Sequence, residues 1–240
     1  MIDWLRKDMI EPEIEIAGQV LPIALKRHSR ARRLTLRLAP DGSEVRLTLP
    51  HWCSTKEAIA FVHARKEWLN AQLERIPENS PPEAGGTLLY RGRSLLIDWQ
   101  EVARRMPVLG DSIVTLGGPR DKLAGRLQRW LEKEALAIMK QDLTLYCERA
   151  DRATPQLRLS RAQRRWGSCS SGGTVRINWR LIQAPDFVRQ SVVAHEVAHL
   201  VHFDHSPAFK ALLQDVYGGP TTEADAWLRE HGRELYASFG

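Results

Sequence analysis

The chain has 240 residues, 43% of them hydrophobic, which excludes an intrinsically disordered protein. Its formal net charge is +6, with 35 Lys and Arg against 29 Asp and Glu. The N-terminal sequence MIDWLRKDMIEPEIEIAGQ has acidic residues where a signal peptide needs an apolar core, and no segment has the ~20 apolar residues of a membrane span. Cys53, Cys147 and Cys169 form no CxxC pair, which argues against disulfides and a thiolate zinc site. We therefore expect a cytoplasmic protein without membrane contact.

The first part of the chain, residues 1–118, is rich in strand patterns. Apolar and polar residues alternate through residues 20–49, and Asp41-Gly42 has the chemistry of a hairpin turn, which predicts a small antiparallel sheet. Residues 54–76 have helical spacing and begin with a capping box of Ser54 and Glu57. Further short strands are expected before the Gly117-Gly118 pair, where we place a domain boundary.

The second part, residues 119–240, is expected to be mainly helical. A long helical pattern covers residues 120–151, and two strand-like runs, QLRLSRAQRRW and TVRINWRLI, are joined by a predicted turn, GSCSSGG. A helix is predicted from about Phe187 to about Val201, and two more over residues 206–218 and 221–239. The fold class expected is therefore α+β.

The sequence His195-Glu196-Val197-Ala198-His199 is an HExxH motif inside the helix predicted to begin near Phe187. Residues four apart share a helix face, so both imidazoles can reach one zinc ion, and Glu196 can take a proton from an activated water. The flanking sequence SVVAHEVAHLV is otherwise apolar. Unpaired polar groups are costly in such a setting, which favours a shared cation.

A third ligand must come from outside these five residues. On a straight helix the Cα of His202 would rise ~10 Å above that of His195, too far for bonds of ~2.1 Å to one ion. Ser206-Pro207 has the pattern of a new helix start, so the chain must turn before it and His205 can fold back. Glu223 is the alternative ligand, because gluzincins use a glutamate on a later helix.

The spacing from His195 to His205 equals that of the metzincin motif HExxHxxGxxH, with His202 at the glycine position. No methionine follows Met139, so the Met-turn of true metzincins is absent. For His202 we favour a turn or surface position over metal ligation, with a substrate contact as the alternative.

The stretch RRWGSCSSGGTVRINWRLIQAPDFVRQSVVAHEVAHLVHFDHSPAFK, Arg164 to Lys210, resembles the signature of the YgjP-like metallopeptidase-domain proteins, relatives of SprT-like and WLM zinc peptidases. The similarity lies in Trp166-Gly167-Ser168-Cys169, in Asn178 and in the HExxH region, and it extends to RRLTLRLAPDGSEVRLTLP near the N-terminus. The resemblance implies a zincin-like fold with a short sheet over the HExxH helix. It also implies zinc, or another divalent metal, on His195, His199 and His205, with Glu196 as general base.

The resemblance leaves the substrate open between peptides and nucleotides, because some family members are described as pyrophosphatases acting on UTP. The span from Arg152 to Pro185 contains seven arginines, Arg152 included, and no acid, so a site there would attract anions, although genome base composition also explains an arginine excess. Arginines bind phosphate bidentately, and Tyr217 could stabilise developing charge. The candidate substrate-binding residues are Arg161, Arg164, Arg165, Arg176, Arg180 and Tyr217.

These observations favour a zinc-dependent hydrolase of peptide bonds. The first alternative is a nucleoside triphosphate pyrophosphatase that uses the same metal centre. The second, which we do not favour, is a nucleic-acid-associated module in which the basic stretch KRHSRARR binds the nucleic acid.

Overall fold

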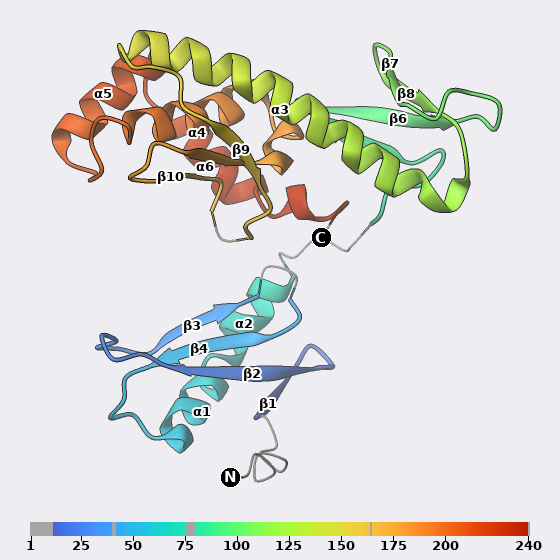
Figure 1. Ribbon diagram of the computed structural model, residues 1–240. Helices are drawn as coiled ribbons and strands as arrows, with labels where there is room; N and C mark the ends of the chain where they lie inside the picture. Colours follow the sequence, from blue (N-terminus) through green and yellow to red (C-terminus); the bar gives the residue numbers. More distant parts are fainter. Residues whose placement is uncertain (1–11, 40–41, 75–79, 164, 240) are drawn as a thin grey trace, which may run out of the picture. The chain divides into compact units, whose positions relative to one another are not determined.

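The computed structural model describes the chain except for residues 1–11, 40–41, 75–79, 164 and 240. The structure combines small β-sheets with groups of helices along the chain, which confirms the α+β class (Figure 1). The chain forms two compact units, Met1–Pro77 and Glu78–Gly240. We call them unit 1 and unit 2. Among the described residues, no helix has the length and apolar character needed to cross a membrane.

Unit 1 is a four-stranded sheet with two helices. Its strands are β1 (Glu13–Ile16), β2 (Gln19–Arg27), β3 (Thr35–Leu38) and β4 (Val45–Leu49), in the order β1-β2-β4-β3. Strands β3 and β4 pair antiparallel, as the alternating pattern predicts, but β2 runs parallel to β4. Asp41 of the predicted Asp-Gly turn lies outside the described residues. The expected all-antiparallel sheet is thus wrong at the pair of β2 and β4, because residues 28–34 carry the chain to the far edge before it returns.

The helix predicted over residues 54–76 is two helices, α1 (Thr55–His63) and α2 (Lys66–Leu73). The predicted capping box is present, since Ser54 accepts from the N–H of Glu57 and the Glu57 carboxylate accepts from the N–H of Ser54. The helical pattern is interrupted at Arg65, whose backbone leaves the helical region at φ −111° and ψ 17°. Both helices pack against the sheet, and the core of unit 1 includes Ile16, Leu47 and Val62.

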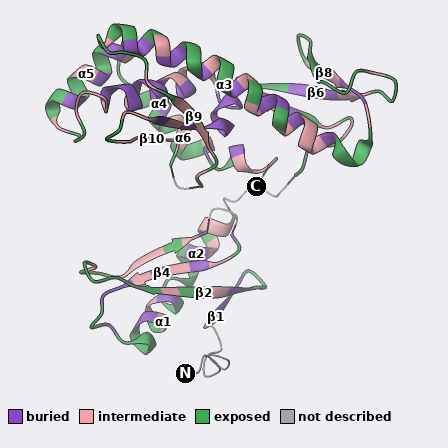
Figure 2. Ribbon diagram, viewed as in Figure 1, coloured by how far each residue is buried: buried purple, intermediate pink, exposed green. Residues whose placement is uncertain are grey.

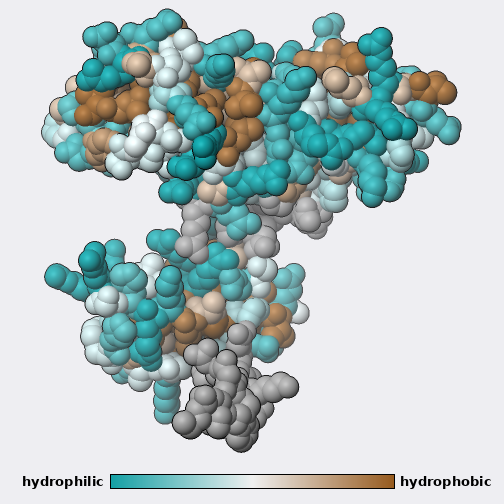
Figure 3. Space-filling view, viewed as in Figure 1, coloured by the Kyte–Doolittle hydropathy of each residue, from teal (hydrophilic) through white to brown (hydrophobic). Residues whose placement is uncertain are grey.

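Unit 2 begins with a second four-stranded sheet, built from β5 (Thr87–Tyr90), β6 (Arg93–Trp99), β7 (Val108–Leu109) and β8 (Ile113–Leu116) in the order β5-β6-β8-β7. Its buried side chains belong to the same core as the helices that follow. For this reason the division into compact units falls at Pro77–Glu78, whereas the boundary expected at Gly117-Gly118 lies inside unit 2. Exposed apolar side chains gather at β7 and the loop before it (Figure 3); they include Met106, Val108 and Leu109.

The rest of unit 2 consists of one long helix, a small sheet and three shorter helices. A 3-10 turn, η2 (Arg120–Lys122), leads into α3 (Leu123–Arg149), and α3 packs against α4 (Asp186–Ala198) and β9 (Leu157–Ser160). The remaining elements are β10 (Gly167–Cys169), β11 (Val175–Asn178), η3 (Trp179–Ile182), α5 (Pro207–Tyr217), α6 (Thr222–His231) and η4 (Glu234–Tyr236).

The small sheet differs from the one expected. Its order is β10-β11-β9, with β10 antiparallel and β9 parallel to β11. Strand β10 lies within the sequence expected to be the turn, so the turn itself is only the segment between Cys169 and Val175. The run TVRINWRLI is a strand only as far as Asn178, whose side chain accepts a hydrogen bond from the N–H of Arg180 and starts η3. As expected, this sheet lies against the helix that carries the HExxH motif.

Candidate metal centre

Helix α4 brings His195 and Glu196 together in its last turn, and His199 is the residue that caps it. The helix ends at Ala198, a few residues before the expected end near Val201. Most of α4 is buried (Figure 2), so its polar side chains lie next to the core of unit 2. The four-residue spacing of His195 and His199 places their imidazoles on one face, with the two Nε2 atoms 3.1 Å apart.

The third histidine comes from the turn between α4 and α5. Ser206 caps α5 by accepting a hydrogen bond from the backbone N–H of Phe209, and Pro207 is the first residue of the helix. His205 precedes this cap and folds back, so that its Nε2 lies 3.4 Å from that of His195. One ligand nitrogen from each of the three histidines therefore lies within 4.8 Å of the others.

The ring of Phe209 packs against all three imidazoles. The centroid of its ring is 5.0 Å from that of His195, 4.6 Å from that of His199 and 4.9 Å from that of His205. Phe209 is itself buried. An apolar group packed in this way limits how far the three rings can rotate.

The main chain of His202 supports the site, although its imidazole is not part of the histidine group. The Nδ1 of His199 lies 2.9 Å from the carbonyl oxygen of His202. A carbonyl only accepts, so Nδ1 must carry the proton and Nε2 keeps a free lone pair for a metal. In the described part of the chain, the histidine group that could hold a metal includes neither the side chain of His202 nor Glu223.

Burial keeps His195 in the form that binds metals. Desolvation, followed by repulsion from His199 and His205, lowers the pKa of His195 to about 4. The charge of Asp225 opposes this shift only in part. The imidazole is therefore neutral at pH 7, as a metal ligand must be.

Glu196 lies against the backbone of β10 and is 5% exposed. A Cβ atom added at Gly167 would lie 2.3 Å from its Oε1, so only glycine leaves room for this carboxylate. Its Oε2 is buried and has no hydrogen-bond partner among the described residues. Burial raises the pKa of Glu196 to about 7, and the positive charge of Arg165 acts in the opposite direction.

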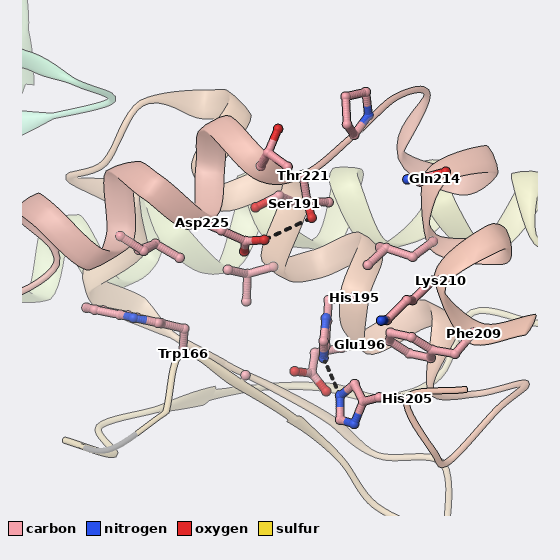
Figure 4. A pocket seen from close by; sticks show the side chains of 16 residues that line it. Trp166, Ser191, His195, Glu196, His205, Phe209, Lys210, Gln214, Thr221 and Asp225 are labelled. Atoms are coloured by element: carbon pink, nitrogen blue, oxygen red, sulfur yellow. Dashed lines mark hydrogen bonds between the residues drawn. The ribbon is translucent and has the colours of Figure 1, made fainter. Parts of the chain in front are cut away.

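A pocket with a volume of about 500 Å³ opens beside the histidines (Figure 4). Part of its wall comes from His195, Glu196 and His205, and the rest comes from the preceding turn of α4, from α5, α6 and the loop between them, and from the start of β10 with the residue before it. The further lining residues are Trp166, Gly167, Ser191, Val192, Phe209, Lys210, Leu213, Gln214, Pro220, Thr221, Thr222, Asp225 and Leu228. A volume of this size suits a bound ligand.

The chain matches the family described as YgjP-like, metallopeptidase domain, over residues 32–231. It belongs to the YgjP-like family. No curated protein and no solved structure shows significant similarity to it. The match begins in unit 1, after β2, and ends in unit 2 at the end of α6, so the family region includes β3, β4 and the two helices of unit 1 as well as the histidine group.

The arginines singled out from the sequence of this YgjP-like protein do not line the pocket in the described part of the chain. Arg161 forms an ion pair with Glu132 of α3, at 2.8 Å. Arg176 lies on β11, and Arg165 is the arginine whose charge acts on Glu196. Arg164 lies outside the described residues.

Arg180 is buried and supports the C-terminal segment of the YgjP-like chain. Its guanidinium lies 4.9 Å from the ring centroid of Trp179 and 4.8 Å from that of Tyr236, and it donates to the carbonyl oxygen of Phe239 at 3.1 Å. The sequence pattern could not predict this position, because it treated Arg180 as part of a strand. Arg180 is in η3 instead.

Tyr217, the other predicted substrate-binding residue, makes a contact within the fold: its hydroxyl donates a hydrogen bond to the carbonyl oxygen of Phe187 at 3.1 Å. Sequence reasoning missed Lys210, Thr221 and Asp225, which do line the pocket. Helical spacing offered a partial signal: Phe209, Lys210, Leu213 and Gln214 recur at intervals that share one face of α5. No comparable pattern pointed to Asp225.

Proposed function

We propose that this protein is a zinc-dependent hydrolase of peptide bonds, in which His195, His199 and His205 hold the metal. The main support is the convergence of three imidazole nitrogens beside a buried oxygen of Glu196 that has no partner in the described chain. Close lone pairs repel one another unless a cation or a proton lies between them, and a buried polar atom without a partner is costly. Three nitrogen ligands with an open fourth position suit catalytic zinc.

When bound, such an ion acts as a Lewis acid that makes a water molecule nucleophilic near neutral pH and polarises the carbonyl group under attack. The side chain of Glu196 would take a proton from that water and pass it to the leaving amine. Gly167 holds the Glu196 carboxylate close to β10 by having no Cβ. The carbonyl of His202 fixes the orientation of His199.

The position of β10 favours an extended peptide as substrate. In the described sheet β10 is an edge strand that pairs with β11, and it contacts α4 next to Glu196. A peptide can add to such an edge through backbone hydrogen bonds, which would align its scissile bond with the histidines.

The nucleotide alternative requires cations around the phosphates. In the described part of the chain, Lys210 is the one Lys or Arg among the pocket-lining residues, and two carboxylates, Glu196 and Asp225, share the pocket with it. Apart from the charge of the metal ion itself, the described side chains of the pocket therefore give a triphosphate little cationic support. We therefore favour peptides.

Incubation of the zinc-loaded protein with casein and, separately, with a panel of nucleoside triphosphates that includes UTP tests the choice. New N-termini from casein, without release of phosphate or pyrophosphate, are the expected result. Release of pyrophosphate from nucleotides without cleavage of casein would contradict the proposal and support the alternative.

The nucleic-acid alternative would depend on unit 1, where the basic residues Lys26, Arg30, Arg32, Arg33 and Arg37 are all exposed. Binding to phosphates would weaken steeply as salt rises. Absence of binding to single-stranded or duplex nucleic acid at ~50 mM salt would dispose of this role.

A further inference from the structure

The pocket beside the histidine group has a second end, formed by α6 and the loop before it. Figure 4 shows Asp225 next to Thr221 on this side, away from His205. The hydroxyl of Thr221 donates to Oδ2 of Asp225 at 3.1 Å. Thr221 therefore binds one carboxylate oxygen of Asp225, and within the described residues no hydrogen bond occupies the other oxygen, which can accept from a ligand.

No Lys or Arg within the described residues forms an ion pair with Asp225. Lys210, the pocket's own cation, is drawn next to Phe209 on the side of His195, away from Asp225 (Figure 4). The charge at the α6 end is therefore negative, which favours a cationic group there.

The walls between the two ends are mostly apolar, with Val192 from α4, Leu213 from α5 and Leu228 from α6. Lysine and arginine side chains combine a long methylene stem with a charged tip, and they bury the stem against apolar surfaces. A pocket of about 500 Å³ has room for such a side chain. A peptide amino terminus would not need this apolar length.

We infer that this pocket is a specificity pocket for a basic side chain, Lys or Arg, of the substrate, and that Asp225 is the residue that selects it. The inference rests on the proposed peptidase function and adds the class of substrate. The basic residue would occupy a fixed position relative to the scissile bond, since one pocket lies at one distance from the histidines. Because Asp225 is exposed to solvent, a preference on the order of tenfold over an apolar residue is expected.

A complex mixture of peptides tests this at every position around the scissile bond at once. The zinc-loaded wild type, Asp225→Asn and Asp225→Lys are each incubated with the mixture, and the cleavage sites are read by mass spectrometry. We expect Lys and Arg to be enriched about tenfold at one position for the wild type. Asp225→Asn should lose this enrichment, and Asp225→Lys should replace it with Asp and Glu.

Glu223→Gln is the matched control, because it removes the same charge from the same helix without touching the pocket lining. It should keep the wild-type pattern, and the bound zinc of every variant is measured in parallel. Cleavage without basic enrichment, or enrichment that survives in Asp225→Asn, would overturn the inference while leaving the peptidase function intact. No cleavage of any peptide by the zinc-loaded wild type would overturn both.

Discussion

Gly167 is the residue where the smallest change should have the largest effect on the site. A methyl group there would lie 2.3 Å from Oε1 of Glu196, well inside any allowed contact. Gly167→Ala must therefore displace the carboxylate, while the three histidines stay in place. Because a misplacement of ~1 Å can cost ~100-fold in rate, we expect a fall in kcat of that order with zinc content unchanged.

Steady-state kinetics and metal analysis of the purified variant measure both quantities. Gly172→Ala is the control, since nothing lies within 4 Å of a Cβ atom built there. A Gly167→Ala variant with the wild-type kcat would show that the position of Glu196 does not limit the reaction.

His205 and His202 make a second pair at the residue scale. His205→Ala removes one of the three nitrogens proposed to bind the metal, whereas His202→Ala keeps the backbone carbonyl that holds His199. We therefore expect His202→Ala to bind zinc much as the wild type does. His205→Ala should lose more than the ~10–100-fold in zinc affinity that is typical when only a supporting partner of a ligand is removed. Competition with a zinc chelator measures both affinities, and equal losses in the two variants would contradict the assigned roles.

At the scale of elements, α4 is fixed at its N-terminus by ionic contacts that join it to its neighbours. The carboxylate of Asp186 binds Arg91, which follows β5, and Arg189. Arg189 also donates from Nε to Asp142 of α3 at 2.7 Å. These contacts hold the helix that carries His195.

The contacts of Asp186 predict how stability depends on pH. Hydrogen bonding from Arg91, and from Arg189 to a lesser extent, lowers the pKa of Asp186 from 3.8 to about 2. A depressed carboxyl pKa stabilises the folded state above the unfolded value and loses this effect as pH falls through the folded value. The free energy of unfolding should thus fall between pH of about 4 and about 2, and less so in Asp186→Asn.

Urea unfolding at several pH values measures this difference. Asp121→Asn, which removes a carboxylate that is 69% exposed, is the control and should follow the wild type. The same slope in Asp186→Asn and wild type would show that other groups cause the acid sensitivity.

Elements with strong local signals were predictable from the sequence, and those set by long-range contacts were not. The turn that returns His205 followed from the Ser206-Pro207 cap, and α4 followed from its apolar pattern. Strand β10 was mistaken for a turn because Gly167, Ser168 and Cys169 have turn-like composition, and pairing with β11 determines its conformation.

The arginines illustrate the same limit for the site. Their number is visible in the sequence, but the direction of each side chain depends on partners far along the chain. Arg161 forms an ion pair with Glu132, and the guanidinium of Arg180 packs over the ring of Tyr236. From α6, the pocket is lined by Asp225, whereas the sequence analysis had considered only Glu223 on this helix, as an alternative metal ligand.

At the scale of the whole molecule, the two units have separate cores. One core extends from Ile14 to Leu69 and the other from Leu88 to Leu235, and they share no residue. All three histidines and the whole pocket lining are in unit 2. We therefore expect a fragment of residues 80–240 to fold cooperatively and to bind zinc like the full chain.

Thermal unfolding followed by circular dichroism, with and without zinc, tests the fragment. A zinc-dependent rise in its midpoint, equal to that of the full chain, is the expected result. A fragment that stays unfolded, or that folds without binding zinc, would show that unit 1 is needed to form the site.

In the proposed mechanism, Glu196 serves as the base of a metal centre built by His195, His199 and His205. Glu196→Gln keeps the shape of the side chain and removes its ability to take a proton, while all three ligands remain. The decisive measurement is the turnover of a peptide substrate by this variant together with its bound zinc. We predict full zinc content and a loss of at least ~100-fold in kcat. Hydrolysis at the wild-type rate by the zinc-loaded variant would show that Glu196 is not the base.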